Sequence, residues 1–262
     1  MFGRWDGIGT RSRAGITVGM ALGLCLSCGA SGAATLGARS GAVSSPVVVA
    51  PQGPNLAQHR GDATPRLSVG AHGRAVVRLQ EQLSDLGFWL GRVDGRFGDA
   101  TQQAVYALQK VAAISPDGVV GRKTWQALRR EVRPVPRGSR GSHVEIDLRR
   151  DLIMFVTGDR LRYVVNTSTG GGFTYVSNGV TSIAATPTGR FRVYNEVNGL
   201  RISPLGELWR PKFFHGGYAI HGSASVPPYP ASHGCVRVSN EAMNWIWSHG
   251  LLPMGMTVWI YR

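Results

Sequence analysis

The stretch DGRFGDAT at residues 94–101 recurs as DGVVGRKT at residues 117–124, so the skeleton D-G-x-x-G-x-x-T appears twice at an offset of 23 residues. An Asp-Gly pair favours a turn, and the second glycine permits a backbone conformation needed just before a helix. Phe97 and Val120 hold the same place in the two copies, where both would fill one core. The repeat therefore predicts two helices that begin after equivalent turns.

Apolar residues recur at helical spacing around this repeat. They predict a helix over 74–87, a second over 100–113 and a short third helix after Gly121 that contains Trp125 and Leu128. The pattern indicates a small three-helix bundle. A break that contains two prolines, at residues 132–138, separates this unit from the rest of the chain.

The apolar period changes from helical to alternating beyond residue 142. One helix is predicted over 241–248, because acidic Glu241 would lie in its first turn and Gly250 just past its end. We expect a mainly antiparallel β domain with few helices. The predicted strands lie at 144–148, 152–156, 161–165, 190–197, around Tyr218 and Ile220, and at 257–261.

The N-terminus has the pattern of an export signal. Three arginines precede an uncharged run over 14–36 that ends among small residues, which is typical of a secretory signal peptide. An uncleaved membrane anchor at 1–36 is the alternative, although its many glycines and serines suit a bilayer poorly. A lipoprotein signal at Cys28 is a weaker alternative. Residues 37–66 are rich in Pro, Gly, Ser and Ala and predict a linker.

The net charge of +14 favours polyanionic partners. For an exported chain, anionic wall polymers or lipid headgroups fit this charge better than nucleic acid does. The sequence has no interleaving of aromatic and basic residues and no zinc-finger spacing, so we expect no nucleic-acid partner.

Loss of the signal would leave Cys235 as the only cysteine, which excludes an internal disulfide framework. The motif SHGCVR at 232–237 places this thiol beside His233, and His221 lies a short loop upstream. A thiolate is the nucleophilic form of cysteine, and an imidazole can accept its proton. This pattern favours a reactive cysteine, and a buried inert thiol is the alternative.

Gly234 would let the backbone turn tightly before Cys235 and leave the N–H of Cys235 free to stabilise an oxyanion. The prolines of residues 223–231 would stiffen the loop that returns the chain from His221 to this turn. The sequence therefore predicts one compact site.

The smaller unit carries the pattern VDG-x-FG-x-x-T-x-x-AV-x-x-LQ at residues 93–109. With the repeat, it resembles the peptidoglycan-binding domain-1 family over residues 67–131. The resemblance implies a module that binds wall glycan or stem peptide. The alternative is a helical spacer that binds nothing.

The larger unit, residues 142–262, resembles the L,D-transpeptidase (YkuD-like) catalytic domain. This resemblance implies a mainly β, sandwich-like domain without metal or cofactor, and together the two predict a protein of two domains. It also implies that Cys235 is the nucleophile, that His221 accepts its proton and that His233 supports the thiol. The segments that carry it are HG at 221–222, SHGCVRV at 232–238, TPTGRF at 186–191 and FFHGG at 213–217.

Neighbouring residues are expected to support the loop or the oxyanion. Gly222 stands where some members have serine, so the group that orients His221 is expected to be a backbone carbonyl. Arg237 stands where others have asparagine, and it could hold a carboxylate or stabilise the loop. The four supporting residues are Ser232, Gly222, Gly234 and Arg237.

The resemblance implies a reaction on peptidoglycan stem peptides as donor and acceptor. The thiol attacks the carbonyl of the third stem residue, D-alanine leaves, and a side-chain amine of a neighbouring stem resolves the thioester into a 3→3 cross-link. Carbapenem-type inhibitors are expected to acylate the same thiol. An exported enzyme of cell-wall biogenesis, located at the wall or the extracytoplasmic face, is therefore predicted.

Other functions are open at this point. Hydrolysis by an L,D-carboxypeptidase, or exchange of a D-amino acid, would use the same fold. A non-catalytic wall-binding protein is a third reading. A zinc hydrolase could use His215, His221, His233 and Cys235 as ligands, but no H-E-x-x-H motif and no acidic residue near these four supports it.

Overall fold

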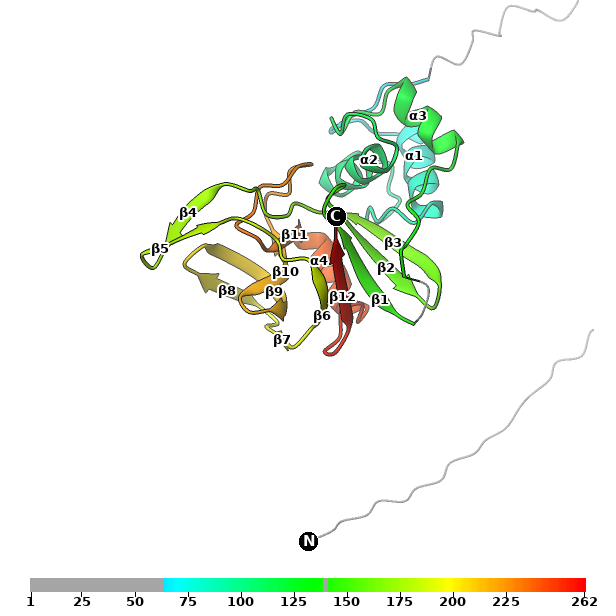
Figure 1. Ribbon diagram of the computed structural model, residues 1–262. Helices are drawn as coiled ribbons and strands as arrows, with labels where there is room; N and C mark the ends of the chain where they lie inside the picture. Colours follow the sequence, from blue (N-terminus) through cyan, green and yellow to red (C-terminus); the bar gives the residue numbers. More distant parts are fainter. Residues whose placement is uncertain (1–63, 139–140) are drawn as a thin grey trace, which may run out of the picture. The chain divides into compact units, whose positions relative to one another are not determined.

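The computed structural model describes residues 64–138 and 141–262, which belong to one compact unit (Figure 1). The signal peptide or membrane anchor predicted at 1–36 lies outside these residues, as does nearly all of the linker predicted over 37–66. Within the described ranges, no helix is long and apolar enough to cross a membrane.

Three helices form the first part of the structure, which confirms the prediction from apolar periodicity. They are α1 (Arg74–Asp85), α2 (Asp99–Val111) and α3 (Arg122–Arg129). Phe97 and Val120, the equivalent residues of the two repeat copies, are 2% and 0% exposed and belong to one hydrophobic core. Each copy of the repeat therefore supplies one side chain to the centre of the bundle.

A buried glutamine on α1 fixes the first copy of the repeat. Gln80 is 1% exposed. Its Oε1 accepts hydrogen bonds from the backbone N–H groups of Asp94 (3.1 Å) and Gly95 (2.8 Å). Its Nε2 donates to Asp94 Oδ1, to the carbonyl of Arg96 and to Thr101 Oγ1, each at 3.0 Å. One side chain thus satisfies most of the polar groups of the turn.

An equivalent glutamine on α2 fixes the second copy. Gln109, also 1% exposed, accepts from the N–H of Gly118 (2.9 Å). It donates to Asp117 Oδ1 (2.7 Å), the carbonyl of Val119 (3.0 Å) and Thr124 Oγ1 (3.3 Å). Because the buried amide of each glutamine is fully hydrogen-bonded, each network defines the position of its turn against its helix.

The second part is rich in strands, and its first sheet has the order β3-β2-β1-β12-β6 (Figure 1). β1 pairs with β12 in parallel, and the other neighbours in this sheet are antiparallel. The sheet consists of β1 (His143–Asp147), β2 (Leu152–Thr157), β3 (Arg160–Asn166), β6 (Gly189–Arg192) and β12 (Thr257–Tyr261).

The second sheet has the order β11-β10-β9-β7, and β8 also pairs with β9. β10 and β11 are parallel, while the remaining pairs are antiparallel, as expected for most of the domain. The sheet consists of β7 (Asn195–Glu196), β8 (Leu200–Ser203), β9 (Gly206–His215), β10 (Tyr218–Ser223) and β11 (Val236–Ser239).

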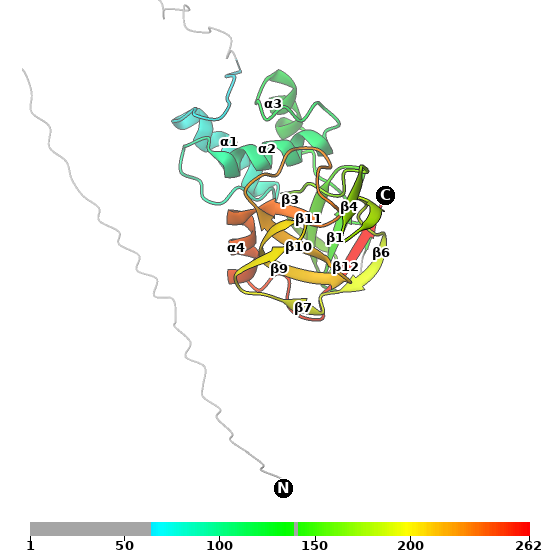
Figure 2. The ribbon, with the colours of Figure 1, turned by 90° about the vertical axis from the view of Figure 1, so that its left-hand side faces the viewer.

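One hydrophobic core joins the two sheets and helix α4 (Asn240–Ser248). Ile146 and Val258 enter it from the first sheet, Ile220 and Val236 from the second, and Met243 from α4. α4 packs against β9, β10 and β11, beside which Figure 2 shows it. The second part is therefore mainly β and sandwich-like, as predicted.

A buried glutamate holds the segment that joins the two parts. Glu145 in β1 is 0% exposed and accepts hydrogen bonds from the N–H groups of Arg137 (2.9 Å) and Gly138 (2.6 Å). Tyr261 Oη donates to it at 2.7 Å, and His143 Nε2 lies 3.1 Å away. Burial alone would raise the pKa of Glu145, but these hydrogen bonds outweigh it and lower the pKa.

The single strand predicted over 190–197 is wrong, because the chain here changes sheets. β6 pairs with β12 in the first sheet, whereas β7 pairs with β9 in the second. Between them, the N–H of Val193 donates to the carbonyl of Met256 and the N–H of Tyr194 donates to the carbonyl of Phe213. A continuous β pattern in the sequence does not reveal a change of partner.

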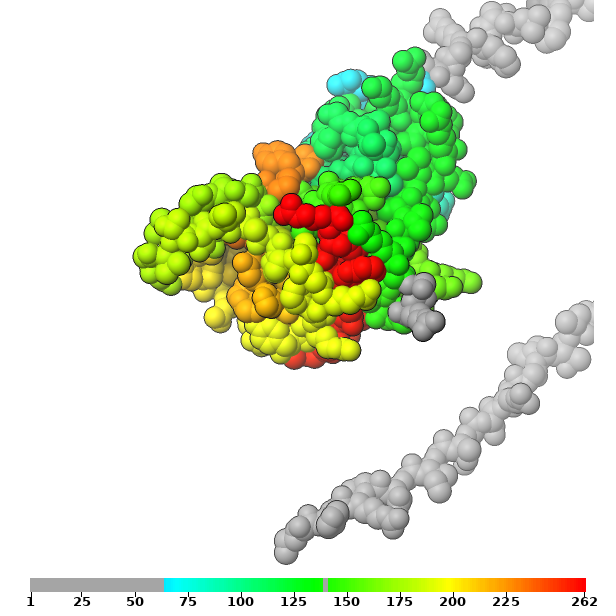
Figure 3. Space-filling view, in the orientation of Figure 1, coloured from blue at the N-terminus to red at the C-terminus, as the bar shows by residue number. Residues whose placement is uncertain are grey.

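The β4–β5 hairpin (Thr174–Ser177 and Val180–Ile183) was not predicted. Asn178 and Gly179 form its turn with φ values of 49° and 76°, which suits the type I′ turn that Asn-Gly favours. The hairpin projects from the surface in Figure 3, in yellow-green.

We predict that Gln80→Leu or Gln109→Leu lowers the free energy of unfolding by at least about 2 kcal/mol, because each leaves buried turn groups without partners. Leucine and glutamine have similar helix propensities, so the helices themselves should persist. Urea denaturation measures the change. Gln126→Leu at an exposed position of α3 is the matched control, and equal effects of all three substitutions would contradict the prediction.

Candidate active site

The parallel pairing of β10 with β11 brings the two halves of the site together. Ile220 lies opposite Val236, and His221 lies opposite Arg237. Cys235 immediately precedes β11, so it lies beside the strand that carries His221. The proline-containing loop predicted between them connects the two strands without being a strand itself.

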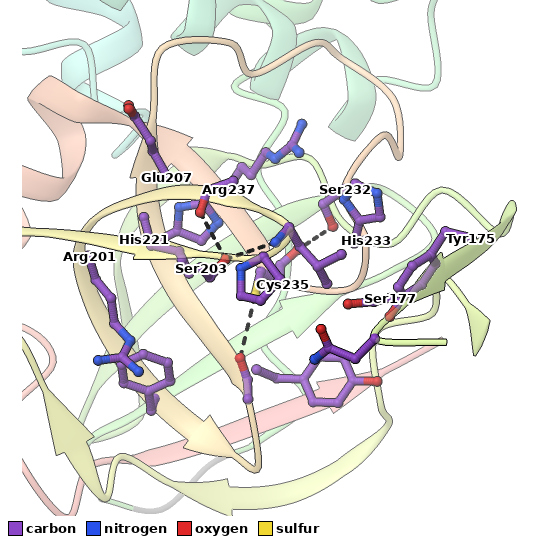
Figure 4. Close-up of a pocket in the computed structure, with 18 residues that line it drawn as sticks. Tyr175, Ser177, Arg201, Ser203, Glu207, His221, Ser232, His233, Cys235 and Arg237 are labelled. Carbon is purple, nitrogen blue, oxygen red and sulfur yellow. Dashed lines mark hydrogen bonds between the residues drawn. The ribbon is translucent and has the colours of Figure 1, made fainter. Parts of the chain in front are cut away.

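A cavity of about 430 Å³ is lined by most of the predicted site residues (Figure 4). Cys235 lies near the middle of the view, with His233 and Tyr175 to one side and Arg201 to the other. The predicted site residues that line the cavity are Cys235, His221, His233, Ser232 and Arg237. Gly234 and Gly222, the other two predicted residues, do not line it.

The turn before Cys235 is held by hydrogen bonds to a serine hydroxyl. Ser232 Oγ accepts from the N–H of Gly234 (2.9 Å) and donates to the carbonyl of Cys235 (2.6 Å). Gly234 has φ of 130°, and a Cβ there would lie 2.6 Å from Tyr218 Cε1 and 2.9 Å from the carbonyl oxygen of Ala185. Only glycine fits this position without a shift of the loop.

His221 has a defined tautomer. Its Nδ1 lies 2.9 Å from the carbonyl oxygen of Gly222, and since a carbonyl only accepts, Nδ1 carries the proton. Nε2 is then the unprotonated nitrogen. A Cβ on Gly222 would lie 2.6 Å from Asn240 Oδ1 and 2.8 Å from Trp209 Cδ1, so serine has no room at this position.

Burial keeps both the Cys235 thiol and the His221 imidazole neutral at pH 7. It lowers the pKa of His221 to about 4, against the hydrogen bond to Gly222, while the charge of Arg237 lowers it further. Burial also raises the pKa of the Cys235 thiol, although the N–H of Ala219 and the charge of Arg237 act in the opposite direction. At pH 7 the pair is therefore a thiol and an imidazole rather than a thiolate and an imidazolium.

His233 packs against two aromatic rings. Its ring packs edge-to-face against Phe173 at 5.2 Å and Tyr175 at 4.9 Å between centroids. His215 is exposed at the end of β9 and stacks on Tyr218, and it does not line the cavity. Among the described residues, no three His, Cys, Asp or Glu side chains gather in a way that could hold a metal ion.

Several residues that line the cavity were not predicted from the sequence. Tyr175, Ser177 and Asn178 come from the β4–β5 hairpin, and Arg201 and Glu207 come from β8 and β9. The Asn178-Gly179 pair was a signal for the first hairpin. The segment between Ser203 and Gly206, which contains a proline, was a weaker signal for the turn between β8 and β9.

Comparison with known proteins gives two family matches. A putative peptidoglycan binding domain matches residues 72–128, and the L,D-transpeptidase catalytic domain matches residues 141–260. The crystal structure of an L,D-transpeptidase from Xylanimonas cellulosilytica is 49% identical, with a TM-score of 0.72, and the match covers 74% of this chain and 97% of that one. The chain belongs to the L,D-transpeptidase family.

Curated relatives match over shorter stretches. The N-acetylmuramoyl-L-alanine amidase CwlM of Mycobacterium tuberculosis is 40% identical over 57 residues, and the spore cortex-lytic enzyme of Bacillus cereus is 42% identical over 59 residues. Each match covers 22% of this L,D-transpeptidase family member. The first covers 14% of the amidase, and the second covers 23% of the cortex-lytic enzyme.

We predict that alkylation of Cys235 by iodoacetamide accelerates with pH and levels off only above the pKa of free cysteine, about 8.5. The raised thiol pKa keeps the unreactive protonated form present to higher pH. Mass spectrometry of the peptide that contains Cys235 measures the rate, with free cysteine as the control. A rate that is already constant between pH 5 and 8 would indicate a preformed ion pair and would contradict the prediction.

We predict that Gly234→Ala reduces L,D-transpeptidase activity by about 100-fold, because a Cβ there would clash with Tyr218 and the carbonyl of Ala185 and displace the turn that carries Cys235. Gly199→Ala is the matched control, since a Cβ there meets no atom within 4 Å. Equal rates for the two variants would show that the turn tolerates displacement.

Proposed function

We propose that this protein is a cysteine-dependent L,D-transpeptidase that forms 3→3 peptidoglycan cross-links. The observation that carries the proposal is the tautomer of His221: Gly222 holds the proton on Nδ1. The basic Nε2 is then free to take a proton in the cavity that Cys235 also lines. A general base needs this combination of orientation and an unprotonated nitrogen.

The reaction begins when the Cys235 thiol gives its proton to His221 as Sγ attacks the carbonyl carbon of the third stem residue. Collapse of the tetrahedral intermediate breaks the peptide bond, and His221 returns the proton to the departing D-alanine amine. A stem amine then attacks the thioester and gives a proton to His221, which restores the thiol as the new amide forms. Because the resting pair is neutral, the thiol must lose its proton to His221 before or during the attack.

Neighbouring groups would stabilise the charge that develops. The Cys235 N–H follows the Gly234 turn and is the proposed oxyanion donor. His233, held by its aromatic neighbours, supports the thiol from the opposite side of the cavity. Arg237 is half-buried in the cavity wall, where a guanidinium can bind a stem carboxylate.

The remaining predictions concern location and partners. We propose that the helical module binds peptidoglycan, that the chain is exported through the signal at its N-terminus, and that anionic wall polymers contact its basic surface. Because carbapenems are acylating agents, we propose that they form a thioester with Cys235.

We predict that the full chain converts a disaccharide-tetrapeptide into a cross-linked dimer with loss of D-alanine, and that Cys235→Ala does not. Mass spectrometry of the products measures both steps. His221→Ala should also lose activity, while His249→Ala, at the exposed end of α4, should retain it.

The other outcomes separate the alternative functions. Monomeric tripeptide as the only product would mean an L,D-carboxypeptidase, and incorporation of added D-amino acid would mean exchange. Substrate binding without any Cys235-dependent product would indicate a non-catalytic wall-binding protein. In the same samples, a carbapenem should add its mass to the wild type and not to Cys235→Ala.

A further inference from the structure

Helix α2 of the helical module inserts a lysine into the catalytic part. Lys110 Nζ donates to the side-chain Oδ1 of Asn166 (2.6 Å) and to the carbonyls of Asp151 and Thr167 (both 3.1 Å). These three hydrogen bonds use all the donors of an ammonium group. The contact is therefore a complete polar site between two parts of the chain that lie far apart in sequence.

The surroundings of this ammonium are buried. Asp151, Asn166 and Thr167 are 3%, 2% and 0% exposed. Burial lowers the pKa of Lys110 to about 8, with the charge of Asp151 acting in the opposite direction, so the ammonium is mostly protonated at neutral pH. Removal of the ammonium would leave Asn166 Oδ1 and the carbonyl of Thr167 without this donor, while the carbonyl of Asp151 would keep the N–H of Thr167 at 3.1 Å. Two buried acceptors without a donor are a large local penalty.

The lysine acts on the segment that borders the catalytic loop. We call residues 167–171 the clamp segment and residues 232–237 the catalytic loop. Thr167 Oγ1 donates to the carbonyl of Arg237 (2.6 Å), and the backbones of Ser168 and Arg237 exchange hydrogen bonds at 3.0 and 3.2 Å. The end of the loop after Cys235 is therefore fixed by the two residues that follow Asn166.

The other end of the catalytic loop is fixed by the same segment. The carbonyl of Thr169 accepts from the N–H groups of Ala231 and Ser232, both at 2.9 Å, and the N–H of Gly171 donates to the carbonyl of Ser232 at 2.9 Å. Thr169 is itself anchored, because its Oγ1 donates to Asp151 Oδ1 at 2.5 Å. Asp151 thus connects the lysine site to Thr167, whose N–H donates to its carbonyl at 3.1 Å, and to Thr169.

A second residue of α2 contacts the loop that leads to the site. Gln103 Oε1 accepts from Asn166 Nδ2 at 2.6 Å, and Gln103 Nε2 donates to the carbonyl of Val226 at 3.2 Å. Val226 belongs to the loop between His221 and Ser232, which Figure 3 shows in orange against the helices. Both connections from α2 therefore end on backbone that determines where Cys235 lies.

We propose that Lys110, assisted by Gln103, is a positioning residue for the catalytic loop, so that the helical module completes the active site in addition to any binding of the wall. The inference rests on the proposed role of Cys235 as nucleophile. Neither side chain lines the catalytic cavity, so their effect is exerted through the clamp segment. Substitution of either residue should therefore lower the rate of the chemical step more than it weakens substrate binding.

Lys110→Met in the full chain tests this inference, because methionine keeps the length and the apolar stem but removes the ammonium. We expect kcat for D-alanine release to fall about 10- to 100-fold with KM within about twofold of the wild type. Alkylation of Cys235 should show a shifted pH profile. Lys123→Met, at an exposed position of α3, is the matched control and should behave as the wild type.

Two further variants keep the test decisive. Gln103→Leu is a less disruptive substitution, to be measured if Lys110→Met fails to fold. Lys110→Arg keeps the charge and the donors, so it should have a kcat between those of Lys110→Met and the wild type. A folded Lys110→Met or Gln103→Leu protein with lower thermal stability but unchanged kcat and pH profile would overturn the inference. A wild type without any Cys235-dependent product would instead overturn the proposed function, so the two failures are distinguishable.

Discussion

The parallel pairing of β10 with β11 is the constraint on which the rest of the site depends. It sets His221 beside the turn that carries Cys235. Parallel strands cannot be joined by a tight turn, so the chain needs a crossover between them, here the proline-containing loop that ends at Ser232. That loop has no strand partner of its own, and its backbone groups are satisfied from outside, by the clamp segment and by Gln103. The position of Cys235, the proposed nucleophile, is thus set by segments distant in sequence.

Burial has opposite effects on the pKa values of His221 and Cys235, and the result is that both side chains are neutral at pH 7. The pKa of His221 falls and that of Cys235 rises, because a low-dielectric environment disfavours both charged forms. A neutral thiol resists oxidation and unproductive reactions better than a thiolate does. The basic nitrogen nevertheless stays available, since the carbonyl of Gly222 occupies the other one.

Helix α2 is shared by the two parts of the structure. The adjacent residues Gln109 and Lys110 serve different parts: the amide satisfies the second repeat turn, and the ammonium enters the catalytic part. Both contacts are buried and polar, so each specifies one geometry rather than a range of apolar packings. A module that is held in this way cannot reorient freely without exposing the acceptors around Asn166.

The three-helix bundle, the mainly β catalytic part and the motif SHGCVR with His221 could all be predicted from the sequence, because apolar periodicity and short motifs are local properties. A carbonyl partner for His221 was also expected, but not its position in the chain. The structure was needed to show that this partner is Gly222, that the chain around Val193 changes sheets, and that Lys110 contacts Asn166. These features depend on which distant segments pair, and the pairing is fixed only when the buried polar groups of the whole fold are satisfied together.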